Sequence, residues 1–211
     1  MASTSRMSVA VQDANAQKKP KLTEIIPPLD FSFLHLGSLE ECEKEEPRDL
    51  SPHKALVKKK STTQTKEKSQ SLGLKLNNNT LKEISNLVPL ATSLFDNVAN
   101  ISWIDLSCNF LSIIDPVLTQ FENLKILYLH GNSIAEMKEV NKLSSLQKLW
   151  KLTLHGNEIE NIKGYRFFVL AALPNLVSFD FSTVTKGDRV TAATFKSFYG
   201  SDKKKQIKRE S

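Results

Sequence analysis

The sequence has few cysteines and no long apolar run. Cys42 and Cys108 are its only cysteines and lie in regions of different character, which excludes a disulfide framework and favours a reducing compartment. The longest apolar stretch, residues 167–173, is far too short to cross a bilayer. The N-terminus lacks the apolar segment of a secretory signal, and its Ser, Ala and basic residues leave a mitochondrial transit peptide as the weaker alternative. We therefore expect a cytoplasmic protein that does not enter a membrane.

Motifs for catalysis and cofactor binding are also missing. The sequence contains no phosphate-binding Gly-rich loop and no GxSxG, HExxH or CxxC pattern. We therefore predict that the protein is not an enzyme and that it holds no cofactor or metal.

Charge is unevenly distributed along the 211 residues, whose formal net charge is +6. Residues 71–185 contain 9 Lys and Arg against 10 Asp and Glu, whereas residues 186–211 contain 8 against 3. The basic character therefore belongs to the ends of the chain, which include the runs Lys58–Lys60 and Lys203–Arg209. Such runs are usually solvated tails. Their alternative role is contact with RNA or with an acidic surface, such as that of tubulin or other axonemal proteins.

Residues 1–70 are predicted to be largely disordered, with one docking segment. That segment, residues 22–39, is apolar enough to pack onto another surface, and Pro27 and Pro28 favour an extended conformation over a helix. The residues from 40 to 70 are charged and polar, as in a solvated linker. The sequence leaves open whether the segment docks onto its own chain or onto a partner.

Residues 71–185 repeat the pattern Leu-x-x-Leu-x-Leu-x-x-Asn-x-Leu. The copies are SLGLKLNNNTL, ISWIDLSCNFL, LKILYLHGNSI and LWKLTLHGNEI, followed by the decayed copy LVSFDFSTVTK, which has Val184 in the Asn position. Each Leu-x-Leu is predicted to be a short strand with its leucines pointing inward, and parallel pairing of these strands would build one continuous core. We therefore expect an α/β solenoid of four or five leucine-rich repeats, a short right-handed horseshoe with a parallel sheet on its concave face.

One asparagine recurs in each of the four complete copies. It follows the strand, where the chain turns away from the sheet, and a buried amide there must be satisfied by neighbouring backbone groups. We predict a structural, hydrogen-bonded ladder that consists of Asn79, Asn109, Asn132 and Asn157.

The segments between the strands predict short helices. Residues 85–98 indicate a helix with Pro89 in its first turns. Apolar residues at every third position after Asn132 favour a 3₁₀-like path, and Tyr165–Leu173 has an amphipathic helical pattern.

A cap is needed at the end of the solenoid, because the last repeat would otherwise expose its core. We predict that the fifth copy forms part of this cap, with Phe179 and Phe181 in inward positions. Residues 186–211 are expected to comprise a cap helix over 188–199 and a basic tail. The helix should press three aromatic residues onto the end of the solenoid: Phe195, Phe198 and Tyr199.

The period-three path and the stretch YRFFVLAALPNLVSFD resemble the SDS22-like class of leucine-rich repeats. That class includes axonemal dynein light chain 1, the regulatory subunit of protein phosphatase 1 and the U2 small nuclear ribonucleoprotein A-prime. The resemblance implies a small cytoplasmic protein without catalytic activity. Relatives that reside in cilia and flagella imply a structural role in an axoneme, although this step is analogy.

The outward-facing strand positions are predicted to form the binding face. Trp103, Ile126 and Tyr128 lie on adjacent strands, and exposed aromatic side chains are typical of protein interfaces. The alternative is that the docking segment of the same chain covers them. The mixture of charges on this face argues against nucleic acid. The remaining candidate contact residues are Asp105, His130, Lys151 and His155.

His130 and His155 occupy the same position in successive repeats, so adjacent strands should place them side by side. Repeat geometry alone explains this recurrence. A zinc site would require further ligands, and none is predicted nearby.

Together these features favour a non-enzymatic scaffold or adaptor that binds a protein partner on its concave face, with a ciliary or flagellar axoneme as the leading context. Two alternatives remain. One is a regulatory subunit that targets a phosphatase or another enzyme, and the other is an RNA-associated protein of the U2 A-prime kind.

Overall fold

The computed structural model describes residues 26–48 and 68–195. The expectations for residues 1–25, 49–67 and 196–211, among them both lysine-rich runs, lie outside the described residues.

Seven short strands form one sheet, and their spatial order equals their order in the sequence. The first six pair in parallel, and β7 pairs antiparallel with β6. This sheet confirms the predicted leucine-rich-repeat solenoid. The strands are β1 (Leu29–Asp30), β2 (Gly73–Lys75), β3 (Trp103–Asp105), β4 (Ile126–Tyr128), β5 (Lys151–Thr153), β6 (Ser178–Phe179) and β7 (Ser182–Thr183).

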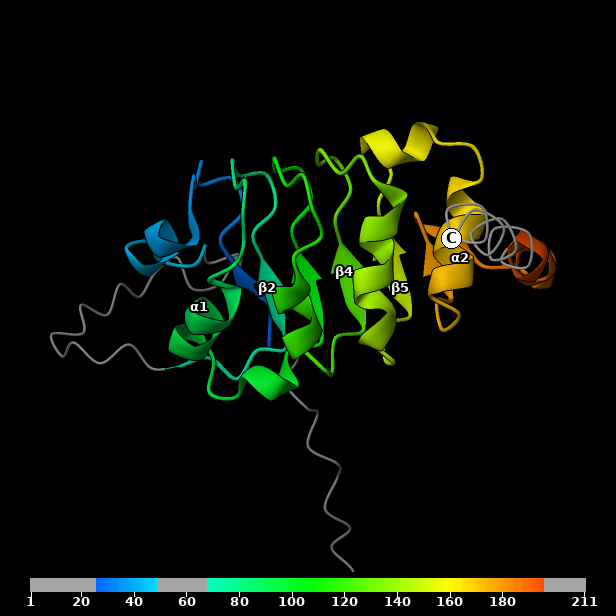
Figure 1. Cartoon of the computed structure of the whole chain (residues 1–211). Helices are drawn as coiled ribbons and strands as arrows, with labels where there is room; N and C mark the ends of the chain where they lie inside the picture. Colours follow the sequence, from blue (N-terminus) through cyan, green and yellow to red (C-terminus); the bar gives the residue numbers. More distant parts are fainter. Residues whose placement is uncertain (1–25, 49–67, 196–211) are drawn as a thin grey trace, which may run out of the picture.

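The main helical return segments lie along one face of the sheet (Figure 1). Along this face η1 contacts α1, α1 contacts η3, η3 contacts η4, and η4 contacts α2. The predicted 3₁₀ path is η4, and the two predicted α-helices are α1 and α2. The segments are η1 (Leu39–Glu43), α1 (Leu87–Leu94), η2 (Val98–Asn100), η3 (Pro116–Gln120), η4 (Met137–Ser145), η5 (Glu158–Asn161) and α2 (Tyr165–Ala172). No helix within the described residues is long and apolar enough to cross a membrane.

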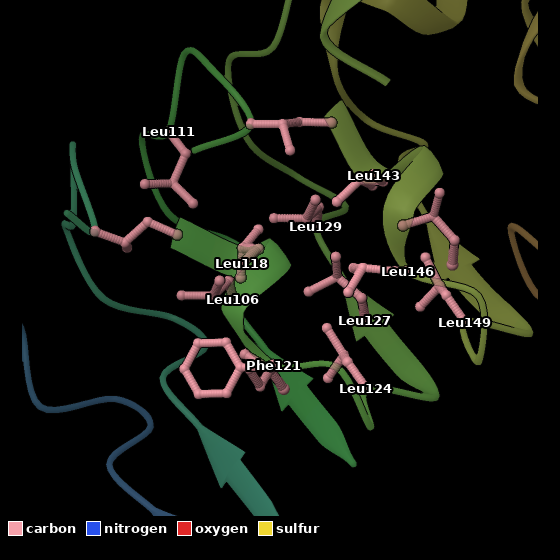
Figure 2. Packing of buried hydrophobic residues seen from close by; sticks show 14 of the residues in the cluster. Leu106, Leu111, Leu118, Phe121, Leu124, Leu127, Leu129, Leu143, Leu146 and Leu149 are labelled. Atoms are coloured by element: carbon pink, nitrogen blue, oxygen red, sulfur yellow. The ribbon is translucent and has the colours of Figure 1, made fainter. Parts of the chain in front are cut away.

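The core lies between the sheet and the helical segments, where inward side chains of successive repeats stack on one another (Figure 2). The strand register places each inward residue beside its counterpart in the next repeat. Burial of one such leucine contributes about 1.5–3 kcal/mol, so the stack is the main source of stability. The fully buried central residues of β2 to β6 are Leu74, Ile104, Leu127, Leu152 and Phe179.

The described part of the predicted docking segment, residues 26–39, forms the first end of the solenoid in cis. Leu29 of β1 pairs with Leu74 of β2, and Phe31 and Leu36 are buried in the common core. The stretch IPPLDFSFLHL therefore acts as an additional repeat, with Leu34 in the place of the asparagine. It lies at the edge of the sheet beside β2 rather than across the outward face.

The ordered part of this N-terminal end continues beyond residue 39. Cys42 in η1 is completely buried, and this burial raises the pKa of its thiol to about 12. The chain then returns along the sheet edge, where the backbone N–H of Arg48 donates to the carbonyl of Asp30 at 2.7 Å. Residues 40–48 are thus part of the folded end rather than of the linker.

At the other end, the fifth copy departs from the repeat pattern after Phe179. Asp180 and Phe181 have φ angles of +48° and +59°, and two consecutive left-handed residues reverse the chain from β6 into β7. The prediction that Phe181 points inward is therefore wrong, since its side chain is 58 % exposed.

The final helix begins at residue 186, two residues earlier than predicted. Thr185 and Asp188 cap it reciprocally, since each backbone N–H donates to the side chain of the other residue. Phe195 packs on the solenoid end as predicted. Its ring lies so close to Gly164 that a Cβ on this glycine would be only 2.6 Å from it.

Candidate functional site

The asparagine ladder joins each repeat to the one before it. Asn132 accepts the backbone N–H of Leu111 at 3.0 Å, and its amide donates to the carbonyls of Leu106 and Leu129 at 3.0 and 2.9 Å. The other three ladder residues bond in the same way. All four side chains are buried and fully engaged, so the ladder is structural and not available to a ligand.

The residue before each ladder asparagine has the same type of backbone conformation in successive repeats. This residue is left-handed in every repeat, with φ angles of +54° to +69° at Asn78, Cys108, Gly131 and Gly156. At Asn78, Cys108 and Gly131 its N–H donates to a carbonyl of the next repeat, as from Gly131 to His155 at 2.9 Å. The N–H of Gly156 donates instead to the carboxylate of Glu160 at 2.7 Å. The recurring His-Gly-Asn is therefore explained by this turn, in which glycine is the least strained residue.

The outward face of the sheet, opposite the helical segments, carries five rings that contact one another. Trp103 and Tyr128 meet edge to face with centroids 6.2 Å apart, and His130 stacks on His155 at 4.7 Å. Phe181 lies 5.6 Å from Tyr128, His130 and His155 alike. These five residues are called the ring cluster below.

Trp103 lies over the backbone of the neighbouring strand. A Cβ on Gly73 would be 2.9 Å from the indole, so only glycine leaves room for this placement. The predicted exposure of Trp103, Ile126 and Tyr128 is only partial, because the side chains cover one another. The indole N–H of Trp103 is buried and has no hydrogen-bond acceptor among the described residues.

Phe181 is held in an unfavourable backbone conformation. A bulky residue with a positive φ costs about 1–3 kcal/mol, and such strain persists only where surrounding contacts compensate for it. Here the compensation comes from three rings of the cluster, each within 5.6 Å. The strained turn thus places an exposed phenyl ring on the outward face.

The two histidines are anchored through their Nδ1 atoms. Nδ1 of His130 lies 2.8 Å from the Thr153 hydroxyl, and Nδ1 of His155 lies 3.3 Å from a carboxylate oxygen of Asp180. Burial, and then the neighbouring His155, lower the pKa of His130, which favours the neutral ring. Within residues 26–48 and 68–195, no three His, Cys, Asp or Glu gather in a way that could hold a metal ion.

The carboxylates on this face are occupied by internal hydrogen bonds. Asp105, predicted as a contact residue, is buried and accepts the backbone N–H and hydroxyl of Ser107 at 3.0 and 2.6 Å. Asp180 accepts the N–H groups of Leu154 and His155 at 2.6 and 3.0 Å. In earlier repeats the residue that corresponds to Leu154 donates to a backbone carbonyl of the next strand, as Leu129 does to Thr153. Because β6 ends at Phe179, the carboxylate of Asp180 takes the place of that carbonyl.

Sequence reasoning missed Asp180 and Phe181 as functional positions. Both fit the repeat pattern, and Asp-Phe lacks the glycine or asparagine that usually marks a two-residue hairpin turn. The available signal was the loss of asparagine at Val184, which shows that the repeat pattern ends there.

The stacked core and the asparagine ladder define the class of the protein, a leucine-rich-repeat solenoid. Comparison with known proteins agrees with this class. A family model described as "Leucine-rich repeat" matches residues 95–210. The chain is 48% identical to the Leucine-rich repeat-containing protein 51 of Macaca mulatta, over 86% of this chain and 91% of that protein. The chain therefore belongs to the family of Leucine-rich repeat-containing protein 51.

More distant matches are consistent with the fold. The chain is 31% identical to the "Probable U2 small nuclear ribonucleoprotein A'" of Caenorhabditis elegans, over 53% of this chain and 44% of that protein. A chain in the crystal structure of the Drosophila melanogaster SNF/U2A' complex superposes with a TM-score of 0.55 at 24% identity, over 65% of this chain and 75% of that chain. The latter similarity concerns the fold alone.

Proposed function

We propose that the protein is a non-enzymatic scaffold or adaptor that binds a protein partner through the outward face of its sheet. The main observation that supports this proposal is the ring cluster, which faces away from the leucine core and includes the 58 % exposed Phe181. Large aromatic side chains dominate binding energy at protein interfaces. Because these rings already pack against one another, little side-chain entropy remains to be lost on binding.

The solenoid architecture supports the same proposal. Parallel strands in sequential order present an extended face on which each repeat contributes its own outward residues. Trp103, Ile126 and Lys151 are neighbours in one such row, so a partner segment lying across the strands would meet each in turn.

The proposal can be tested with a variant that removes two rings, Tyr128→Ser with Phe181→Gly. Glycine relieves the left-handed strain at position 181, so folding should be largely retained. Truncation of interface anchors typically costs about 2–4 kcal/mol, or roughly 30- to 1,000-fold in affinity. Affinity purification of the full chain with mass spectrometry, from ciliated and non-ciliated tissue, should show proteins that the wild type retains and the variant loses.

A matched control removes two apolar side chains elsewhere. Phe110 and Ile113 are 54 % and 50 % exposed, and they follow the ladder residue Asn109 rather than facing outward from a strand. The variant Phe110→Ser with Ile113→Ser should retain every partner. If the ring variant melts like the wild type and still retains all partners, the outward face is not the binding site. If it unfolds, Phe181→Gly alone serves as the test.

We propose further that this assembly is cytoplasmic and belongs to a ciliary or flagellar axoneme. Support comes from the resemblance of η4 and the C-terminal cap to the class of repeats that contains axonemal dynein light chain 1. A fluorescently tagged full chain expressed in ciliated cells should accumulate along the axoneme. A uniform signal that is not enriched in cilia would contradict this placement.

A ribonucleoprotein particle is the second candidate, and the 31% identity to the Caenorhabditis elegans protein supports it. The occupied carboxylates Asp105 and Asp180 make the outward face more suitable for protein than for RNA in such a particle. Purification with and without ribonuclease would identify this case, since particle proteins and RNA would be recovered together. Recovery of a phosphatase or another enzyme that depends on the ring cluster would instead indicate a targeting subunit.

A further inference from the structure

The outward face carries a cation whose position is fixed by two aromatic rings. The ammonium nitrogen of Lys151 lies 5.5 Å from the ring centroid of Tyr128 and 5.5 Å from that of Phe181. Both distances are within the range of cation–π attraction. In the part of the chain that the structure describes, this ammonium group forms no ion pair and no hydrogen bond. Its hydrogen-bond donors are therefore unmatched by the residues that the structure describes.

The other charges nearby are already matched. Lys75 pairs with Asp30 at 2.8 Å at the N-terminal end of the sheet. The carboxylate of Asp105 is buried against Ser107, and that of Asp180 accepts two backbone N–H groups at the end of β5. Lys151 is thus the cation in the middle of this face that a partner could still neutralise, whereas Arg48, at the N-terminal edge, already bonds the carbonyl and hydroxyl of Ser32.

We propose that the protein segment bound across the outward face is acidic, and that one of its Asp or Glu carboxylates pairs with Lys151 between Tyr128 and Phe181. This inference rests on the proposed function. The two rings hold the ammonium group in place and shield it from water, which strengthens a charge-assisted hydrogen bond. They also offer apolar contacts on either side, so the acidic residue should have aromatic or aliphatic neighbours in the bound segment.

Other charged ligands fit the face less well. A basic segment would be repelled by Lys151, and like-charge contacts across an interface cost binding energy. A nucleic acid requires several cations along its phosphates, whereas among the described residues the middle of this face offers Lys151 near the two carboxylates Asp105 and Asp180. A single carboxylate on a protein segment matches the single available cation.

Selection from a phage-displayed library of random dodecapeptides on the immobilised full chain tests this assignment. The wild type should enrich peptides with Asp or Glu beside apolar residues, and Lys151→Gln should lose that acidic preference. Lys82→Gln removes the same charge from an exposed position in the turn after the first ladder asparagine, and it should select like the wild type.

The affinity of an enriched peptide should then depend on the charge pair. Loss of a charge-assisted hydrogen bond predicts about 10- to 100-fold weaker binding to Lys151→Gln, measured by fluorescence anisotropy. Replacing the acidic residue of the peptide by its amide should weaken binding to the wild type similarly and have little further effect on Lys151→Gln. Binding to the wild type should also weaken as the salt concentration rises.

The outcomes separate this inference from the proposed function. If the wild type enriches peptides without acidic residues, and Tyr128→Ser with Phe181→Gly abolishes their binding, the acidic inference is overturned and the proposed function stands. If no peptide is enriched, or if enriched peptides ignore both variants, both proposals fail. A single-stranded RNA oligonucleotide could instead displace the peptide in a Lys151-dependent manner and bind more tightly than the peptide does. That result would overturn the inference of an acidic protein segment and favour nucleic acid as the ligand.

Discussion

The inward and outward rows of the same sheet follow different rules. The central inward residues of β2 to β6 are all large and apolar, whereas the outward residues change character on every strand. The outward row reads Gly73, Trp103, Ile126, Lys151 and Ser178, in register with one another. Both rows share the same backbone, so strand geometry cannot explain the difference. The uniform row builds the core that every repeat must share, and the variable row is available for recognition.

The polar residues of the molecule divide in the same way. The ladder asparagines are identical in four repeats and make the same bonds, while polar outward residues such as Asp105 and Lys151 have different partners. Repetition therefore marks residues that serve the fold, and departure from repetition marks residues that serve either a partner or the ends of the solenoid.

The substitution Asn132→Leu tests most directly whether the repeated polar residues serve the fold. The substitution leaves the Leu111 N–H without its acceptor. It also removes one of the two amide donors to each of the carbonyls of Leu106 and Leu129, which keep those of Asn109 and Asn157. Each buried unsatisfied group costs about 1–3 kcal/mol, which is a large share of the stability of about 5–15 kcal/mol that is typical of a domain. We expect a fall in melting temperature of roughly 10 °C or more, measured by circular dichroism.

Asn141→Leu provides the matched control for this prediction. Asn141 is exposed in η4 and lies outside the ladder, so the same chemical change should leave the melting temperature nearly unchanged. Equal melting of the two variants would show that the ladder contributes no stability and that the repeated asparagine does not serve the fold.

A smaller effect is expected at the point where repetition ends. Asp180→Ala removes the acceptor of the Leu154 and His155 N–H groups and places alanine at a φ of +48°. Because Asp180 is partly exposed, water can replace some of this bonding, and we expect a loss of about 2–3 kcal/mol in the free energy of unfolding.

Asp180→Asn should be much milder in the same denaturant titration. Asparagine tolerates the left-handed conformation, and its side-chain oxygen can accept both bonds, because the two N–H groups share one carboxylate oxygen of Asp180. If alanine and asparagine were equally tolerated, Asp180 would not terminate the sheet, and the C-terminal end would depend only on contacts such as that between Gly164 and Phe195.

The repeats were predictable because their inward residues are periodic. The strands, the ladder, η4 and α2 all follow from spacing, since burial imposes the same residue types at the same intervals. The two ends did not follow. The stretch that contains β1 has Leu34 where the ladder asparagine should stand, so the sequence predicted an isolated docking segment there. Phe181 fits the inward position of the repeat pattern, and no local residue type indicates that Asp180 and Phe181 are both left-handed and reverse the chain.

The candidate site was predictable only in part, for a related reason. The row position of Trp103, Tyr128 and the two histidines follows from register, and their ring contacts follow from side-by-side strands. The burial of Asp105 and the position of Phe181 beside Tyr128 depend on individual side-chain contacts, which the periodicity of the repeats does not predict.

The smallest expected effect concerns the pH dependence of stability on the outward face. Burial, and then His155, lower the pKa of His130 in the folded state, whereas Asp105 and Asp180 act in the opposite direction and only partly offset this. The unfolded chain therefore binds more protons at mildly acidic pH. The stability contributed by neutral His130 is present above the unfolded pKa and is lost as the pH falls through the folded pKa.

His130→Phe tests this linkage because it preserves a ring between His155 and Phe181 but cannot titrate. Between neutral and mildly acidic pH, the wild type should lose more melting temperature than the variant. The pH range should stop above the titration of the carboxyl groups. Burial alone would raise the pKa of Asp30, but its bonds to Lys75 and Ser32 outweigh burial and lower this pKa. Protonation of Asp30 therefore destabilises the fold only at lower pH. Parallel pH profiles for the two proteins would mean that protonation of His130 is not coupled to folding. A charged imidazole at this position on the outward face would then be no less stable than one in the unfolded chain.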